Sequence, residues 1–203
     1  MQYLIIAGPQ ASGKTTTKNY LEKRCNDCNN KNVIFLQETR SIINRKYNPF
    51  GALTITRDLE YKIIEEDLKR LKDIEETEKN KEIIYVDETS IFSLAHSGLH
   101  NIETKPYFKE YLDVLKKLNP KILFLDVKPE ISWLRRKEKY EKKVADMGED
   151  ERGEAMKEFR IYLDYVYPEL IKMFEQINIP KARITNWTKD YIDKNAWKSV
   201  KYS

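Results

Sequence analysis

Cysteine and long apolar runs are both scarce in this chain of 203 residues. The two cysteines, Cys25 and Cys28, lie far in sequence from both histidines, whereas a structural zinc site normally takes four ligands. We therefore expect two free thiols, as is usual in a reducing compartment. No segment reaches the roughly 18 uninterrupted apolar residues that span a bilayer, and the apolar stretch near the amino terminus is too short for a signal peptide. These absences predict a cytoplasmic protein without a membrane partner.

The excess of one sign of charge over the other is also small. The chain has 37 lysines and arginines against 33 aspartates and glutamates, which gives a net charge of +4. Such an excess helps to attract a polyanion such as ATP, but it falls short of the basic stripe that marks nucleic-acid binding. We therefore do not expect a nucleic-acid partner.

Five short apolar runs alternate with stretches of helical periodicity. Four of the runs are continuous rather than alternating, which is typical of strands covered on both faces. The runs occupy residues 3–7, 33–36, 83–86, 122–125 and 182–185. Helical periodicity covers residues 55–74, 103–118, 129–144 and 156–174, and the last helix is expected to bend or divide at Pro168. This alternation predicts one three-layer α/β/α domain over residues 1–203, with a five-stranded, mainly parallel sheet.

Glycine is rare, with six residues, yet two glycines frame a motif directly after the first apolar run. Residues 8–15 read Gly-Pro-Gln-Ala-Ser-Gly-Lys-Thr and open a predicted helix, which is the strand–loop–helix setting of a phosphate-binding P-loop. Backbone N–H groups of such a loop surround a β-phosphate, the lysine reaches the β- and γ-phosphates, and the threonine hydroxyl ligates Mg²⁺. The motif therefore predicts a P-loop NTPase fold that binds ATP and Mg²⁺. The residues expected to bind the nucleotide here are Gly8, Gln10, Ala11, Ser12, Gly13, Lys14, Thr15 and Thr16.

Acidic residues follow three of the predicted strands, at the sheet edge where open α/β sheets bind ligands. Asp87 and Glu88 end the third strand in the manner of a Walker B segment, so Asp87 is expected to hold Mg²⁺ together with Thr15. Glu38 follows the second strand and is expected to act as general base or to orient an acceptor hydroxyl, a role for which Glu88 competes. Asp126, after the fourth strand, is expected to form a turn and cap a helix.

Taken in order, these segments resemble the nucleoside and nucleotide kinase branch of P-loop proteins, which includes deoxynucleoside kinases, thymidylate kinase and ribosylnicotinamide-kinase-like domains. The segments that carry the resemblance are residues 8–16, Gln37-Glu38-Thr39-Arg40, residues 57–71, Val86-Asp87 and Ser93-Leu94-Ala95. The resemblance implies that Glu38 faces the acceptor hydroxyl and that Arg40 steadies the phosphoryl group. The family usually has an arginine directly after the acid that ends the third strand, whereas this chain has Asp87-Glu88. Arg57 or Arg40 is the candidate substitute for that arginine.

The resemblance also assigns roles to segments outside the P-loop. A basic segment at about residues 133–150 stands where the family has its helical lid, which implies that Arg135 and Arg136 close over the phosphoryl group and exclude water. A solvated basic helix face is the alternative reading of this segment. Tyr47 borders the expected acceptor pocket and Asn186 the expected adenine site. Relatives are often homodimers, which makes a homodimer the candidate assembly.

Two functions are compatible with these motifs. The first is an ATP- and Mg²⁺-dependent phosphotransferase that acts on a nucleoside, a nucleotide or a similar small molecule. The second is a P-loop ATPase or nucleotide-dependent switch in which Asp87 and Glu88 activate water. The basic lid favours the first function and the Asp-Glu pair the second. For the first, the expected catalytic residues are Lys14, Glu38, Asp87, Arg135 and Arg136, and the expected acceptor-binding residues are Glu38, Arg40, Tyr47 and Arg57.

Overall fold

The computed structural model describes residues 2–28, 32–47, 56–78, 83–118, 120–185 and 187–194. Within them, five parallel strands form one sheet in the order β2-β3-β1-β4-β5. The strands are β1 (Gln2–Ala7), β2 (Val33–Phe35), β3 (Ile84–Glu88), β4 (Pro120–Leu125) and β5 (Lys181–Ile184). The predicted five-stranded parallel sheet is therefore confirmed, and each strand lies on one of the five apolar runs.

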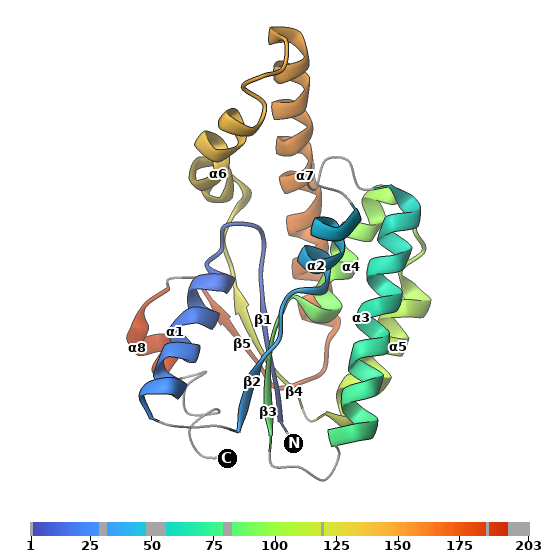
Figure 1. The fold of residues 1–203 in the computed structure, drawn as a ribbon, viewed down its shortest axis with the longest axis vertical. Coiled ribbons are helices and arrows are strands. Elements are labelled where there is room, and N and C mark those ends of the chain that lie inside the picture. Colours follow the sequence, from blue (N-terminus) through green and yellow to red (C-terminus); the bar gives the residue numbers. More distant parts are fainter. Residues whose placement is uncertain are drawn as a thin grey trace.

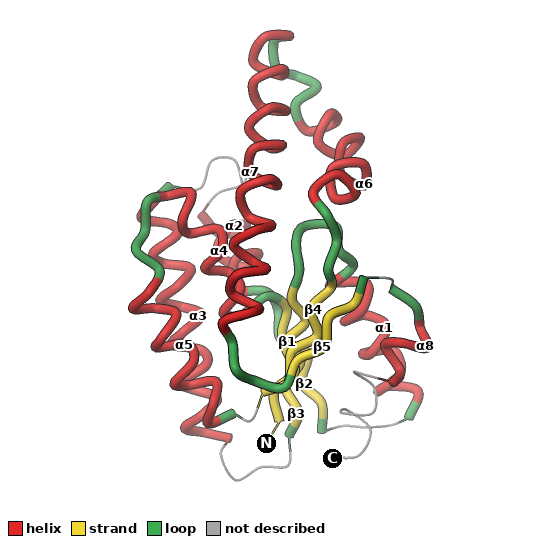
Figure 2. Tube along the Cα trace, turned by 180° about the vertical axis from the view of Figure 1, so that it is seen from behind, coloured by secondary structure: helices red, strands yellow, loops and turns green. Residues whose placement is uncertain are grey.

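Helices cover both faces of this sheet (Figures 1 and 2). On one face lie α1 (Lys14–Asp27) and the short α8 (Lys189–Ile192). On the other face lie α3 (Arg57–Glu78), the 3₁₀ helix η2 (Ser90–Ser93), α4 (Leu94–Ser97), α5 (Lys105–Lys117) and the carboxyl-terminal part of α7 (Glu149–Gln176). The remaining helices are α2 (Thr39–Tyr47), η3 (Gly98–His100) and α6 (Pro129–Lys143). This is the predicted three-layer α/β/α arrangement.

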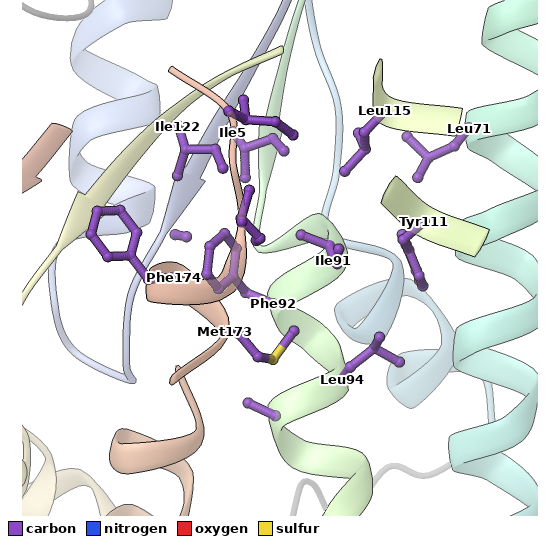
Figure 3. Packing of buried hydrophobic residues seen from close by; sticks show 14 of the residues in the cluster. Ile5, Leu71, Ile91, Phe92, Leu94, Tyr111, Leu115, Ile122, Met173 and Phe174 are labelled. Atoms are coloured by element: carbon purple, nitrogen blue, oxygen red, sulfur yellow. The ribbon is translucent and has the colours of Figure 1, made fainter. Parts of the chain in front are cut away.

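Strand residues alternate between two hydrophobic cores, one on each face of the sheet. Leu4 and Ile6 of β1 pack on the α1 side together with Leu21. Their neighbours on β1 point to the opposite core, which Figure 3 shows around Phe92 and Phe174. Because side chains alternate along a strand, two adjacent residues at a strand end face different helical layers. This alternation decides which strand-end acid meets the P-loop.

The helices α6 and α7 project beyond the carboxyl edge of the sheet (Figure 1). The proline at position 168 predicted that its helix bends or divides, and the predicted division is wrong because α7 continues through Pro168 as one helix. Val166 and Leu170, on either side of it, are buried in the core next to the sheet, so packing holds both halves of the helix in place. In the part of the chain that the structure describes, no helix has the length and apolar character needed to cross a membrane.

Candidate functional site

The loop between β1 and α1 has the backbone of an anion cradle. Gly8 and Gly13 adopt φ angles of 142° and 99°, in a region that L side chains rarely enter. A Cβ atom at Gly8 would lie 2.4 Å from the backbone oxygen of Leu125, so a side chain has no room there. Ser12 Oγ is buried and has no hydrogen-bond partner among the described residues. A buried hydroxyl without a partner, next to the amides that open α1, fits a phosphate group as its partner.

A cavity of about 850 Å³ opens over this loop. All eight residues that the sequence predicts to bind the nucleotide from residue 8 to residue 16 line this cavity. The ammonium group of Lys14 lies along the loop and donates hydrogen bonds to the backbone oxygens of Gly8 and Pro9, at 2.9 and 3.0 Å. Burial lowers the pKa of Lys14, while Glu38 and Glu88 act against that shift. The P-loop lysine and two carboxylates are therefore close enough to influence one another.

The two acids that end β3 point to opposite faces of the sheet. Glu88 faces α1, where it accepts a hydrogen bond from Thr15 Oγ1 at 2.9 Å and lies 3.1 Å from Lys18 Nζ. Asp87 is fully buried on the other face, where it accepts hydrogen bonds from Tyr3 and from an arginine of α3. The sequence assigned the place beside Thr15 to Asp87, but the structure gives it to Glu88. The apolar run located the strand without revealing which residues face the P-loop.

Glu38 lies after β2 and lines the same cavity as Lys14. Each of its carboxylate oxygens accepts a hydrogen bond, from Ser41 Oγ at 2.6 Å and from Thr89 Oγ1 at 3.0 Å. Burial alone would raise the pKa of Glu38, but Lys14, the hydroxyl donors and Arg40 bring this pKa below the usual value of a glutamate. The carboxylate is thus charged at neutral pH and held in a fixed orientation.

Thr89 supplies one of those hydrogen bonds from a backbone conformation that is costly for a β-branched residue. Its φ angle is 79°, and such strain typically costs on the order of 1–3 kcal/mol. Strained residues of this kind concentrate at functional sites. Sequence reasoning missed Thr89, because nothing in the strand pattern indicates a positive φ at a threonine.

Arg40 also lines the cavity, but its guanidinium group is already engaged. Both terminal nitrogens bond to the buried Glu60 carboxylate, one of them at 2.7 Å, and one also donates to the backbone oxygen of Ser93 at 3.2 Å. The expected contact between Arg40 and a phosphoryl group would have to break this buried pair. Arg57, the other candidate, is exposed on α3, with its guanidinium carbon 5.7 Å from the centroid of the Tyr61 ring, and is not among the described lining residues.

The helix α6 brings the two predicted lid arginines to the cavity. Arg135 donates a hydrogen bond to the backbone oxygen of Ala11 at 2.8 Å. Arg136 is near enough to Lys14 for its positive charge to help lower the pKa of Lys14. From α7, the Tyr162 hydroxyl accepts a hydrogen bond from the side chain of Gln10 at 3.1 Å. Both helices thus contact the P-loop directly.

Two histidines that the sequence predictions did not include, His96 and His100, line the cavity on the side of Arg40. Burial lowers the pKa of His96 to about 3, and its Nδ1 donates to the backbone oxygen of Ser93 at 3.2 Å. Among the described residues, no three or more His, Cys, Asp or Glu side chains gather to hold a metal ion. The side chain of Tyr47 and the whole of Asn186 lie outside the described residues.

Comparison with known proteins finds a protein of similar fold but no match in sequence. No family model matches the chain, and no curated protein matches it. A solved structure of deoxyadenosine kinase from M. mycoides with bound dATP matches with a TM-score of 0.56 and 13% sequence identity. The match covers 98% of this chain and 99% of that chain. At this identity the match shows the fold alone, and it confirms the predicted three-layer α/β/α fold.

Proposed function

We propose that this chain is an ATP- and Mg²⁺-dependent kinase that phosphorylates a hydroxyl group of a nucleoside-like small molecule. The observation that carries the proposal is that Lys14 of the P-loop and the Glu38 carboxylate face a single cavity. A phosphate cradle and a group able to orient a hydroxyl therefore share one space. The deoxyadenosine kinase with the same fold supports both a nucleotide ligand and a nucleoside acceptor.

Thr15 and Glu88 fit the metal ion that this reaction needs. Their side-chain oxygens lie 2.9 Å apart at the start of α1, and both are the hard oxygen ligands that Mg²⁺ prefers. When bound, Mg²⁺ neutralises charge on the β- and γ-phosphates. Glu88 thereby takes the role that sequence patterns gave to Asp87.

The transfer itself needs no covalent enzyme intermediate. The acceptor hydroxyl oxygen forms a bond to the γ-phosphorus while the bond from that phosphorus to the β,γ-bridging oxygen breaks, and its electron pair leaves with ADP. Glu38 accepts the hydrogen bond of the attacking hydroxyl and passes its proton to solvent, a step that its ionised state allows. Lys14 and the lid arginines offset the charge on the transferred group.

The described residues around Glu38 favour a neutral acceptor over a phosphorylated one. The charge of Arg40 is balanced by Glu60, and His96 stays neutral because burial lowers its pKa to about 3. Arg40 and His96 therefore offer a phosphate no unpaired charge, and the Glu38 carboxylate would repel it. The lysines and arginines that also line the cavity are Lys14 of the P-loop and Arg135, Arg136 and Lys139 of α6, which we assign to ATP. We therefore propose the hydroxyl of a nucleoside, rather than the phosphate of a nucleotide, as the acceptor.

Hydrolysis by an Asp87–Glu88 pair finds no support in this geometry. The two carboxylates point to opposite faces of the sheet, and Glu88 alone of the two lines the cavity. The pair therefore does not act on one water molecule, and we do not propose the ATPase or switch.

Substitution of Lys14 tests the assignment of the site. Lys14→Ala is expected to lower the transfer rate by at least about 100-fold, the usual cost of losing one group that stabilises transition-state charge. Its melting temperature is expected to stay near that of the wild type. Lys23→Ala, on the exposed side of α1, is the matched control and should transfer normally. Normal transfer by Lys14→Ala would remove the P-loop from the mechanism.

A further inference from the structure

The segment that carries Glu38 has little support from the sheet. It leaves β2, a three-residue strand at the sheet edge, and its last backbone bond to β3 runs from Leu36 N to the oxygen of Val86 at 2.9 Å. The helix α2 begins directly after Glu38. A catalytic carboxylate placed on such a short connection needs other contacts to fix its position.

Those contacts come from one turn of α3, which holds the residue on each side of Glu38. Arg70 Nη1 donates a hydrogen bond to the backbone oxygen of Gln37 at 2.6 Å. On the other side, the Thr39 hydroxyl donates to the Asp67 carboxylate. Asp67 and Arg70 are three positions apart and lie on the same face of the helix, where they pair at 2.8 Å. Neither side chain is among the described residues that line the cavity.

The same pair is anchored in the body of the protein. Arg70 Nη2 lies 3.0 Å from the Asp87 carboxylate of β3, which also accepts a hydrogen bond from Tyr3 of β1 at 2.7 Å. The second oxygen of Asp67 accepts a hydrogen bond from Tyr111 of α5 at 2.8 Å. Hydrogen bonds between charged groups are the strong ones, and burial strengthens them further. The segment around Glu38 is thus tied to two central strands and to α5.

We propose that Asp67 and Arg70 form a clamp that positions Glu38 for phosphoryl transfer. This inference rests on the proposed role of Glu38 in the kinase reaction. The clamp fixes the backbone at Gln37 and Thr39, and Ser41 and Thr89 then orient the carboxylate. Displacement of a catalytic group by about 1 Å typically costs about 100-fold in rate, so a loosened clamp acts on turnover. It also gives Asp87 a role, as the anchor of Arg70 rather than a metal ligand.

Two variants of the clamp and one matched control test the proposal. Arg70→Gln removes the guanidinium bonds, and Thr39→Val removes one hydroxyl with almost no change of shape, which keeps the test open if Arg70→Gln fails to fold. The control is Lys72→Gln, on the same helix as Asp67 and Arg70, which breaks the exposed pair between Lys72 and Glu110 of α5 without touching the Glu38 segment.

The two measurements are hydrogen exchange of the peptides that cover residues 36–43 and steady-state kinetics with ATP and the best acceptor nucleoside. Both clamp variants are expected to exchange faster in this segment and to lose about 10- to 100-fold in kcat, with the KM for ATP within about twofold of the wild type. The control is expected to match the wild type in both. Because unfolding of part of a sample also lowers the apparent kcat at an unchanged KM, kcat is calculated per folded molecule, with the folded fraction taken from thermal unfolding. Loss of a network that merely stabilises the fold would leave this kcat unchanged.

Unchanged exchange in residues 36–43, or faster exchange with normal kcat, would overturn the clamp. A wild-type protein that transfers phosphoryl groups to no acceptor overturns the proposed function, and the catalytic role of the clamp with it. In that case hydrogen exchange still decides whether Asp67 and Arg70 hold the segment.

Discussion

At the scale of single residues, the two acids that end β3 have opposite surroundings although they are neighbours in sequence. Glu88 meets the hydroxyl of Thr15 and the ammonium group of Lys18 next to the P-loop. Asp87 meets Tyr3 and Arg70 in the opposite layer. Burial, with the nearby Asp67 charge, raises the pKa of Asp87 to about 7, although Arg70 acts against the shift. The two side chains are therefore expected to differ in their relation to Mg²⁺.

The dependence of activity on Mg²⁺ separates the two acids. Glu88→Gln is expected to raise the Mg²⁺ concentration for half-maximal transfer by about 10- to 100-fold, because a charged ligand becomes a neutral amide. Asp87→Asn should leave that concentration unchanged, even where it lowers kcat through the clamp. The measurement is a Mg²⁺ titration of the initial rate at saturating nucleotide. A raised requirement in Asp87→Asn alone would return the metal to the residue that the sequence pattern favoured.

Single residues also show which parts of the proposed site the sequence could predict. The P-loop was predictable because its chemistry is local, and every residue from Gly8 to Thr16 except Pro9 lines the cavity. The choice between Asp87 and Glu88 depends on which side chains of β3 face α1. A continuous apolar run does not indicate this, because it is apolar on both faces. The engagement of Arg40 depends on Glu60, a partner 20 positions away that local spacing does not identify.

At the scale of elements, the helices α6 and α7 form a small unit above the sheet with its own apolar cluster. Phe159 stacks on Tyr140 with ring centroids 3.7 Å apart and lies 5.9 Å from the Trp133 ring. The buried residues of this cluster belong to neither core of the sheet, and Tyr162 packs both against the cluster and against the core around Phe92. The unit rests on the P-loop through the bond from Arg135 to Ala11. We propose that it is the lid expected at residues 133–150.

If α6 and α7 form a lid, loss of the Arg135 side chain is expected to affect the exclusion of water more than the binding of ATP. Arg135→Gln is expected to raise the ratio of ATP hydrolysis to acceptor transfer by about tenfold, because a loosened lid admits water to the γ-phosphate. The ratio is measured as ADP formed without and with a nucleoside. Lys142→Gln breaks the exposed pair with Glu138 on the same helix and serves as the control. Equal ratios in both variants would favour the alternative of a solvated basic helix.

Elements were predicted well where burial is uniform and less well where tertiary packing overrides local preference. The strands β1, β3 and β4 are largely buried and appear as continuous apolar runs, which located them. The edge strands β2 and β5 are partly exposed, and short apolar runs located them as well. Pro168 predicted a bend or a division of α7, and the division is absent because core packing on both sides of the proline keeps the helix continuous. The predicted contact of Asn186 with adenine falls outside the described residues and stays a prediction.

At the scale of the whole molecule, strand order brings the proposed site together. The neighbouring strands β2, β3 and β1 end beside Glu38, Glu88 and the P-loop respectively, all at the carboxyl edge of the sheet. The alternation of strands and helices predicted a parallel sheet, but it did not give this order. The single domain over residues 1–203 and the homodimer stay predictions, because the description covers one copy and part of its chain.

The most direct test of the central claim is ADP formation by the wild-type protein with ATP and Mg²⁺, measured across a panel of nucleosides and nucleoside monophosphates. The account predicts little ADP without an acceptor, a marked increase with at least one nucleoside, and a phosphorylated product in equal amount. It predicts weaker turnover with the matching monophosphate. Rapid ADP formation that is independent of any acceptor would contradict the account, as would transfer to monophosphates alone.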